Sequence, residues 1–161
     1  MIIRMAGPRD ASGMTDLQNA VIRVGGTTAF EVARSVDAVT QAYLTGPQAL
    51  CAHLAEAEGR ILGFQVLGLY PGMPDRWGDI GTFVHPDIQR GGIGAALFAA
   101  TLRWARANRV PTLLAVIRAD NRVGLGYYAK CGFVDWGSEP DITLQDGRVV
   151  GRVTKRLDVA S

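Results

Sequence analysis

The spacing of hydrophobic residues changes several times along the chain, and each change predicts a new element. Between Asp10 and about Val24, apolar residues recur at steps of three and four, which indicates an amphipathic helix with Asp10 or Ser12 as its cap. Similar patterns occur in three later segments. The predicted helices are residues 10–24, 36–44, 93–108 and 122–130.

Runs of β-branched, aromatic and alternating residues predict the strands. Residues 49–58 and 60–70 are expected to form a hairpin that turns at Glu58 and Gly59. Residues 112–117 are apolar throughout, which is typical of a strand in the centre of a sheet. The other predicted strands are residues 1–5, 79–86, 132–137 and 148–157.

Length and composition favour one ordinary globular domain. The chain has 161 residues, of which 48% are apolar and 20% charged. Helices and strands follow one another without a repeat or a linker, so a single α/β domain over residues 1–161 is expected. No apolar run approaches the roughly 20 residues of a membrane span, and no secretory signal is recognisable, so we expect a cytoplasmic protein without a membrane partner.

Charge and metal-binding residue types argue against two further classes. The net charge is only +2 and basic residues are spread along the chain, so a nucleic-acid partner is not expected. Cys51 and Cys131 lie far apart among apolar neighbours, and we expect both to be reduced packing residues. His53 and His85 lack the partners that a zinc site needs, so no metal is expected. Trp77 is the one tryptophan in a loop that could touch a substrate.

Three glycines, Gly91, Gly92 and Gly94, stand at the start of the third predicted helix. The pattern lacks the last glycine of a dinucleotide-binding G-x-G-x-x-G, and it lacks the Gly-Lys-Ser/Thr of a P-loop. A strand, a glycine turn and a helix N-terminus together present several backbone N–H groups at the positive end of a helix dipole. That arrangement suits a pyrophosphate. The alternative is a turn that merely changes the direction of the chain.

Three segments together resemble the GNAT superfamily of N-acetyltransferases. Residues Gln89–Ala95 match its Q/R-x-x-G-x-G/A signature, and "TFVHPDIQ" upstream is similar to its fourth strand and turn. Downstream, "DNRVGLGYYAKCGF" is similar to its N-x-x-A-x-x-F-Y-x-x-x-G-F, with Gly124 where alanine is common. The resemblance implies a mixed central sheet of six to seven strands with helices on both faces, acetyl-CoA as co-substrate, and no metal.

The same resemblance implies which residues hold acetyl-CoA. The backbone of the glycine turn would bind the pyrophosphate, and the fourth strand would run along the pantetheine arm. Asn121 would hydrogen-bond the cofactor, although it could instead serve only as the cap of the following helix. The implied cofactor-binding residues are Thr82, Phe83, Val84, Gln89, Arg90, Gly91, Gly92, Ile93, Gly94, Ala95, Asn121 and Tyr128.

Tyr128 resembles the general acid of the family, which would protonate the leaving thiolate. Its neighbour Tyr127 leaves the helix about 100° away, so we expect that the two cannot serve equally. The alternative role for Tyr128 is a packed aromatic residue with a satisfied hydroxyl. If its pKa stays near the reference value, activity should decline towards about pH 10.

The general base is predicted with less support. The segment "TTAFE" resembles a part of the phosphinothricin acetyltransferase-like branch, in which a glutamate lies near the substrate, and this makes Glu31 the first candidate. Its alternative is a solvated carboxylate with water as the base. Asp79, just before the cofactor segment of the fourth strand, is the second candidate.

The expected function is transfer of the acetyl group of acetyl-CoA to a primary amine of a small, amino-acid-like molecule by direct attack. The alternative is an acyl-CoA-binding regulatory module without turnover, which would need the glycine turn but no placed phenol. A protein acceptor finds no support in the sequence. The identity of the amine and a homodimer both stay open.

Overall fold

The computed structural model describes residues 1–73, 75–88 and 91–159. One sheet of seven strands has the order β1-β2-β3-β4-β5-β7-β6, in which only β4 and β5 run parallel. The strands are β1 (Ile2–Met5), β2 (Ala49–Ala57), β3 (Arg60–Leu69), β4 (Gly78–Val84), β5 (Thr112–Arg118), β6 (Val134–Thr143) and β7 (Val149–Asp158).

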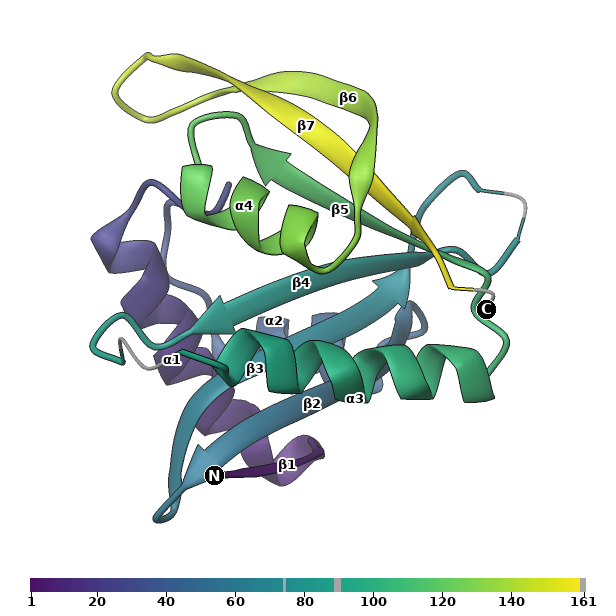
Figure 1. Cartoon of the computed structure of the whole chain (residues 1–161). Helices are drawn as coiled ribbons and strands as arrows, with labels where there is room; N and C mark the ends of the chain where they lie inside the picture. Colours follow the sequence, from purple (N-terminus) through teal and green to yellow (C-terminus); the bar gives the residue numbers. More distant parts are fainter. Residues whose placement is uncertain (74, 89–90, 160–161) are drawn as a thin grey trace.

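Helices cover both faces of this sheet, as Figure 1 shows. In that view α3 and α4 lie in front of the sheet, and α1 and α2 lie behind it. The expected α/β architecture with helices on both faces is therefore confirmed. The helices are α1 (Ala11–Val24), α2 (Val36–Thr40), α3 (Ile93–Ala107) and α4 (Arg122–Lys130), with short turns η1 (Pro8–Asp10) and η2 (Gln41–Thr45). No helix in the described ranges is long and apolar enough to cross a membrane.

Two elements differ from their predicted bounds. The second helix is α-helical only to Thr40 and continues as a π-turn, which ends where the Gly46 N–H donates to the Gln41 carbonyl. A Cβ at Gly46 would lie 2.0 Å from that carbonyl oxygen, so the turn requires glycine. Strand β6 extends to Thr143 through Pro140, because it is an edge strand, where a missing N–H is tolerated.

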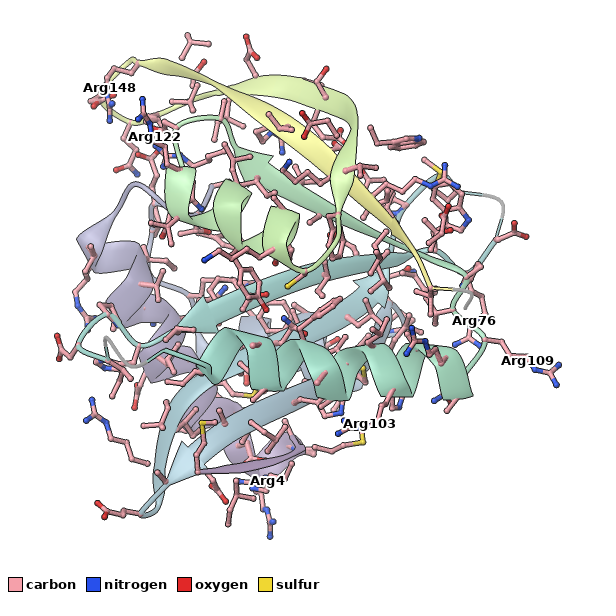
Figure 2. The ribbon with its side chains drawn as sticks, in the orientation of Figure 1. Arg4, Arg76, Arg103, Arg109, Arg122 and Arg148 are labelled. Atoms are coloured by element: carbon pink, nitrogen blue, oxygen red, sulfur yellow. The ribbon has the colours of Figure 1, made fainter. Side chains whose placement is uncertain are left out.

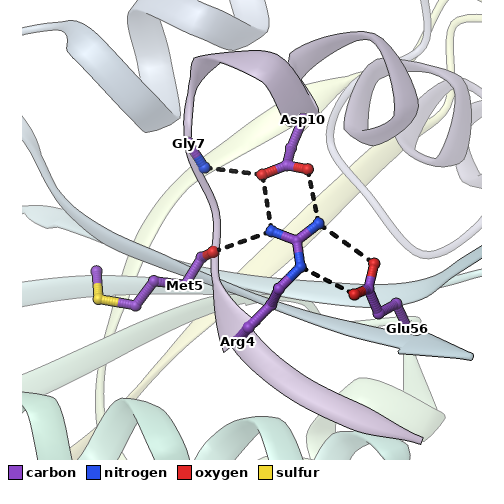
Figure 3. A network of polar contacts seen from close by, with 5 residues as sticks. All are labelled: Arg4, Met5, Gly7, Asp10 and Glu56. Atoms are coloured by element: carbon purple, nitrogen blue, oxygen red, sulfur yellow. Dashed lines mark hydrogen bonds and ion pairs between the residues drawn. The ribbon is translucent and has the colours of Figure 1, made fainter. Parts of the chain in front are cut away.

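A partly buried ion-pair network joins the N-terminus to the sheet (Figure 3). The Arg4 guanidinium donates to Asp10 at 2.8 Å and to Glu56 of β2 at 3.0 Å. Asp10 also accepts from the Gly7 N–H at 2.9 Å. Asp10 does stand at the N-cap position of α1, but its side chain makes no cap hydrogen bond there. The expected capping by Asp10 or Ser12 is therefore corrected: Asp10 is used by Arg4, and Ser12 lies inside the helix.

The sheet splits between β4 and β5. These two strands pair only at Gly78 with Leu113 and at Asp79 with Leu114. Gly78 permits the close contact, because a Cβ there would lie 3.0 Å from a side-chain atom of Leu113 in β5. Beyond Asp79 the strands diverge (Figure 1), so the edge of β4 that faces β5 has no sheet partner.

Candidate active site

A cavity of about 850 Å³ occupies the split. Its walls come from β3, β4, β5, α4, the start of α3 and the loop at 27–30. Seven of the expected cofactor residues line it: Thr82, Phe83, Val84, Gly91, Gly94, Asn121 and Tyr128. Gln89 and Arg90, also expected to bind the cofactor, lie outside the described residues.

The glycine turn forms the start of α3 at one end of the cavity. Gly92 is the N-cap residue with a φ of 93°, a left-handed conformation that favours glycine. The Ala96 N–H donates to the Gly92 carbonyl, so the N–H groups of Ile93, Gly94 and Ala95 come before the first N–H donor of the helix. The Ile93 side chain itself is buried in the core. What this turn offers to a ligand is thus backbone N–H groups at a helix N-terminus.

Tyr127 packs directly on this turn. Its hydroxyl donates to the Gly94 carbonyl at 2.7 Å, and a Cβ at Gly94 would come 2.6 Å from its ring. Tyr127 and Tyr128 both line the cavity, with ring centroids 4.9 Å apart. The two rings leave α4 in different directions, and the cavity extends along both faces of α4 that carry them, so their unequal roles stay a prediction.

Tyr128 is buried, and its hydroxyl lies 2.8 Å from that of Thr82 in β4. Thr82 also accepts a hydrogen bond of 2.9 Å from the Gln65 side chain of β3. Burial holds the pKa of Tyr128 above its ordinary value, and the hydrogen bond with Thr82 opposes this only in part. The expected decline of activity towards pH 10 is corrected accordingly, since Tyr128 keeps its proton beyond that pH.

Asp79 lies where the two strands part, and it lines the cavity. Its carboxylate reaches the solvent of the cavity but has protein on most sides. This burial raises the pKa of Asp79 to about 6, and repulsion from Glu139 raises it further in the same direction. Glu139 itself accepts a hydrogen bond from the Tyr70 hydroxyl. Asp79 is thus a carboxylate that changes its charge near neutral pH inside the cavity.

Glu31, the first candidate for the base, is not among the residues that line the cavity. Its side chain is exposed and accepts a hydrogen bond of 2.8 Å from the Gln145 N–H in the β6–β7 turn. Of the two carboxylates considered, only Asp79 lines the same cavity as Tyr128.

Asn121 has both ends of its amide in use. Its oxygen accepts from the Gly124 N–H at 2.9 Å and caps α4, and its nitrogen donates to the Thr27 carbonyl at 3.0 Å. A Cβ at Gly124 would lie 2.5 Å from that nitrogen. The glycine that departs from the family pattern is therefore coupled to the position of the Asn121 side chain. One amide hydrogen of Asn121 remains available to a ligand.

The loop that follows α1 closes one side of the cavity. Arg118 of β5 donates to the Thr28 carbonyl at 3.1 Å, which holds the loop across the split. Phe30 from this loop lies 4.4 Å below the Arg34 guanidinium, which also donates to the Tyr43 hydroxyl at 3.0 Å. Phe30 and Tyr43 both line the cavity and give it an aromatic wall.

Two arginines line the cavity, and they differ in their pairing. Arg118 is buried and forms a bidentate ion pair with Asp120. Arg152 of β7 donates two hydrogen bonds to the Pro140 carbonyl and has no ion pair within the described part of the chain. Figure 2 shows that Arg122 and Arg148 lie at the same end of the molecule as the start of α4, whereas Arg76 and Arg109 lie at the opposite end.

Trp77 does not touch the cavity. Its ring packs 5.7 Å from that of Trp136, with the Arg156 guanidinium 4.6 Å above it. The expectation that it could touch a substrate is corrected, because these contacts hold its ring against β6 and β7 and it is not among the residues that line the cavity. Cys51 and Cys131 are both free thiols, as expected. In the described ranges no three His, Cys, Asp or Glu side chains gather where they could hold a metal ion.

Sequence reasoning missed Gln65, Tyr43 and Arg152. For Gln65 a signal does exist, because it is the one polar side chain between Ile61 and Leu69 of an apolar strand. Tyr43 and Arg152 carry no local signal, since their place in the cavity depends on how distant segments meet.

Comparison with known proteins agrees with this geometry. The model of the acetyltransferase (GNAT) family matches residues 25–133. The L-methionine sulfoximine/L-methionine sulfone acetyltransferase of Pseudomonas aeruginosa is 31% identical over 154 residues, which cover 91% of this chain and 87% of that protein. The mycothiol acetyltransferase of Saccharomonospora viridis is 38% identical over 87 residues.

That second match covers 50% of this chain and only 28% of the mycothiol acetyltransferase, so the chain corresponds to a part of a longer relative. The fold is shared with the phosphinothricin acetyltransferase of Sinorhizobium meliloti, solved in complex with acetyl-CoA. The TM-score is 0.83 at 18% identity, over 98% of this chain and 87% of that one. The split sheet, the glycine turn and these matches agree: the chain belongs to the acetyltransferase (GNAT) family.

Proposed function

We propose that the protein transfers the acetyl group of acetyl-CoA to the primary amine of a small, amino-acid-like molecule. The observation that carries this proposal is that the split places Asp79, Tyr128 and the unpaired edge of β4 around one cavity. The unpaired edge can add the pantetheine arm as an extra strand, and the glycine turn can bind the pyrophosphate at the positive end of α3.

In this proposal the pantetheine runs along Thr82, Phe83 and Val84, and the pyrophosphate lies on backbone N–H groups at 91–95. The Asn121 amide contributes its remaining N–H. Support comes from the cavity, which connects the β4 edge with the glycine turn. The acetyl end would then lie near Tyr128, deep in the split.

The reaction removes two protons from the protonated amine and supplies one to the leaving sulfur. A protonated amine gives a proton to the Asp79 carboxylate, and the neutral nitrogen attacks the thioester carbonyl carbon. As the C–N bond forms and the C–S bond breaks, the Tyr128 hydroxyl gives its proton to the leaving sulfur. The nitrogen then loses one of its two remaining protons to solvent, solvent reprotonates Tyr128, and Asp79 releases its proton to solvent. The products are the N-acetylated amine and coenzyme A as a free thiol.

Amino-acid-like acceptors suit the remaining walls of the cavity. Arg152 is a lining cation without an ion pair in the described residues, which suits a carboxylate. Phe30, Tyr43 and Phe83 give an apolar wall for a side chain. The Pseudomonas aeruginosa relative, named for L-methionine sulfoximine and L-methionine sulfone, supports the same class of acceptor.

Release of free thiol from acetyl-CoA, measured across a panel of amines, tests this function. The panel contains L-methionine sulfoximine, L-methionine sulfone, phosphinothricin, and for each of them the amine that lacks the carboxylate. We expect turnover with at least one amino acid and a weaker response to its decarboxylated partner. Tight acetyl-CoA binding with no thiol release from any amine would instead favour the regulatory acyl-CoA-binding module.

A further inference from the structure

Gln65 is a fully buried amide in the middle of strand β3, between Phe64 and Val66. Its nitrogen donates to the Thr82 hydroxyl at 2.9 Å and to the Tyr127 hydroxyl at 3.0 Å. Its oxygen has no hydrogen-bond partner among the described residues. A buried polar atom without a partner destabilises a fold, so an apolar residue would serve packing better. The amide therefore calls for a reason other than stability.

Tyr127 fixes which way this amide faces. The single hydroxyl proton of Tyr127 is donated to the Gly94 carbonyl at 2.7 Å, so toward Gln65 this hydroxyl can only accept. If the amide were turned over, its oxygen would face the Tyr127 oxygen with no proton between them. The Gln65 nitrogen must consequently face both hydroxyls, and one of its hydrogens is directed at Thr82.

That hydrogen in turn sets the direction of the Thr82 hydroxyl. Thr82 Oγ1 accepts from Gln65 and lies 2.8 Å from the Tyr128 hydroxyl, whereas the Tyr127 oxygen, which is also close to Thr82, already accepts from Gln65. A chain in which each group accepts from one neighbour and donates to the next is strengthened by polarisation. Thr82 then donates to the Tyr128 oxygen. The proton of Tyr128 is not used by Thr82 and is left for the cavity.

We propose that Gln65 is a positioning residue, which sets the direction of the hydroxyl chain through Thr82 so that the Tyr128 proton points into the cavity. This proposal rests on the proposed function, in which Tyr128 supplies the proton to the leaving thiolate. The amide acts on two oxygens at once: it orients Thr82 toward Tyr128, and it holds Tyr127 against the start of α3. Gln65 therefore sets the direction of the hydrogen bonds between these hydroxyl groups and makes no contact with the substrate itself.

The first test replaces the amide by a side chain of similar length without a donor, Gln65→Met. The turnover number should fall about 10- to 100-fold, which is less than the 10² to 10⁴-fold that loss of a general acid gives. The KM for the amine and the dissociation constant for acetyl-CoA should stay near the wild-type values, because Gln65 touches neither. Thermal unfolding of the variant, followed by circular dichroism, shows whether the fold is retained.

The second test is a double-mutant cycle with Tyr128→Phe. If Gln65 acts through the Tyr128 hydroxyl, Gln65→Met should cost little further turnover once that hydroxyl is gone. The matched control is Gln18→Met, because Gln18 is also fully buried and also donates to a tyrosine hydroxyl, that of Tyr43. Gln18→Met should change turnover by the same factor in the wild-type background and in the Tyr128→Phe background.

The same cycle is measured by denaturant unfolding, which needs no turnover. Gln65→Met should change the unfolding equilibrium constant by one factor in the wild-type background and by another in the Tyr128→Phe background. We expect these two factors to differ at least about twofold. Wild-type turnover in Gln65→Met would overturn the proposal, and so would an equal loss in both backgrounds. If the wild-type protein releases no thiol with any amine, the proposed function fails, and equal unfolding factors would then overturn the positioning role independently.

Discussion

The ring of Tyr127 lies so close to Gly94 that a single added methyl group would come within 2.6 Å of it. The Tyr127 hydroxyl also donates to the carbonyl of Gly94. Gly94 is therefore required by α4 packing on α3, whatever the turn binds. Gly91 differs, because a Cβ there would meet nothing within 4 Å and its φ is not positive. A substitution at Gly91 therefore tests phosphate binding alone, whereas a substitution at Gly94 would also disturb the packing of α4 on α3.

Gly91→Val is expected to weaken acetyl-CoA binding about tenfold or more, because the side chain would occupy the space that the pyrophosphate needs to approach the backbone. The folded state should be unaffected, since the added atoms have room. Isothermal titration with acetyl-CoA measures the first effect and thermal unfolding the second. Gly126→Val, at another open glycine on α4 outside the cavity, is the matched control and should bind normally. Normal binding by Gly91→Val would remove the phosphate assignment.

Asp79→Asn is expected to lower turnover by about 10² to 10⁴-fold, because the amide cannot accept the proton of the amine. In the wild-type protein, turnover should rise with pH as the carboxyl ionises, with a midpoint near its pKa of about 6. The variant should lack this rise. The pH dependence of kcat at saturating acetyl-CoA is the measurement, and Glu31→Gln is the control that should keep it. If the rise of kcat with pH were lost in Glu31→Gln and kept in Asp79→Asn, Glu31 rather than Asp79 would be the base.

The same carboxyl should make stability depend on pH. The pKa of Asp79 is raised from 3.8 to about 6 in the folded protein, so the fold favours the protonated form. Its stabilising contribution is complete below about pH 3.8 and is lost as the pH rises through about 6. Asp79→Asn should thus have a higher Tm than wild type at pH 8, with a difference that shrinks below pH 4. Equal Tm differences at both pH values would show that Asp79 ionises normally.

Tyr128→Phe removes only a hydroxyl and keeps the ring packed against Phe133. We expect a loss of turnover of about 10² to 10⁴-fold with an unchanged acetyl-CoA dissociation constant. Because burial keeps the pKa of Tyr128 above its ordinary value of 10.0, the wild-type rate should show no alkaline decline due to this group up to pH 10. Full turnover in the variant, under conditions where chemistry limits the rate, would assign the proton to water.

Arg152→Gln should raise the KM for amino-acid acceptors about 10-fold or more, because a charge-assisted hydrogen bond to the carboxylate is lost. The KM for the matching amine without a carboxylate should hardly change. Arg109→Gln is the control, since Arg109 is exposed, does not line the cavity, and lies at the end of the molecule opposite Arg122 and Arg148 (Figure 2). An equal rise in KM for both kinds of amine would mean that Arg152 supports the cavity without binding the carboxylate.

The sequence pattern predicted most of the fold because the core is periodic. The glycine turn could be predicted from the sequence as a turn at a helix N-terminus, but the sequence does not show that the packing of Tyr127 requires Gly94. The second half of β6 could not be predicted as a strand, because Gly137 and Pro140 look like turn residues. Only the pairing with β7 at the sheet edge makes this segment a strand. Local sequence predicts a helix or strand correctly only where contacts with distant segments do not change its structure.

The site was less predictable, for geometric reasons. The helix phase separates Tyr127 from Tyr128 correctly, but the phase does not show that the cavity extends around both rings. The choice between Glu31 and Asp79 depends on where the loop after α1 is held by Arg118 and Asn121, residues about 90 positions away. Gln65 is visible as a polar residue in an apolar strand, but its partners belong to two other elements. Such contacts are set by the tertiary fold.

The central claim is a proton-coupled acetyl transfer that runs through Asp79 and Tyr128. Its most direct test measures, in one reaction with L-methionine sulfoximine, the thiol released and the N-acetylated product formed, as a function of pH. The account predicts one product molecule for each thiol, a rate that falls below about pH 6 in the wild-type protein, and no such fall in Asp79→Asn. Thiol release without N-acetylated product from any amine of the panel, or an unchanged pH profile in Asp79→Asn, would contradict it.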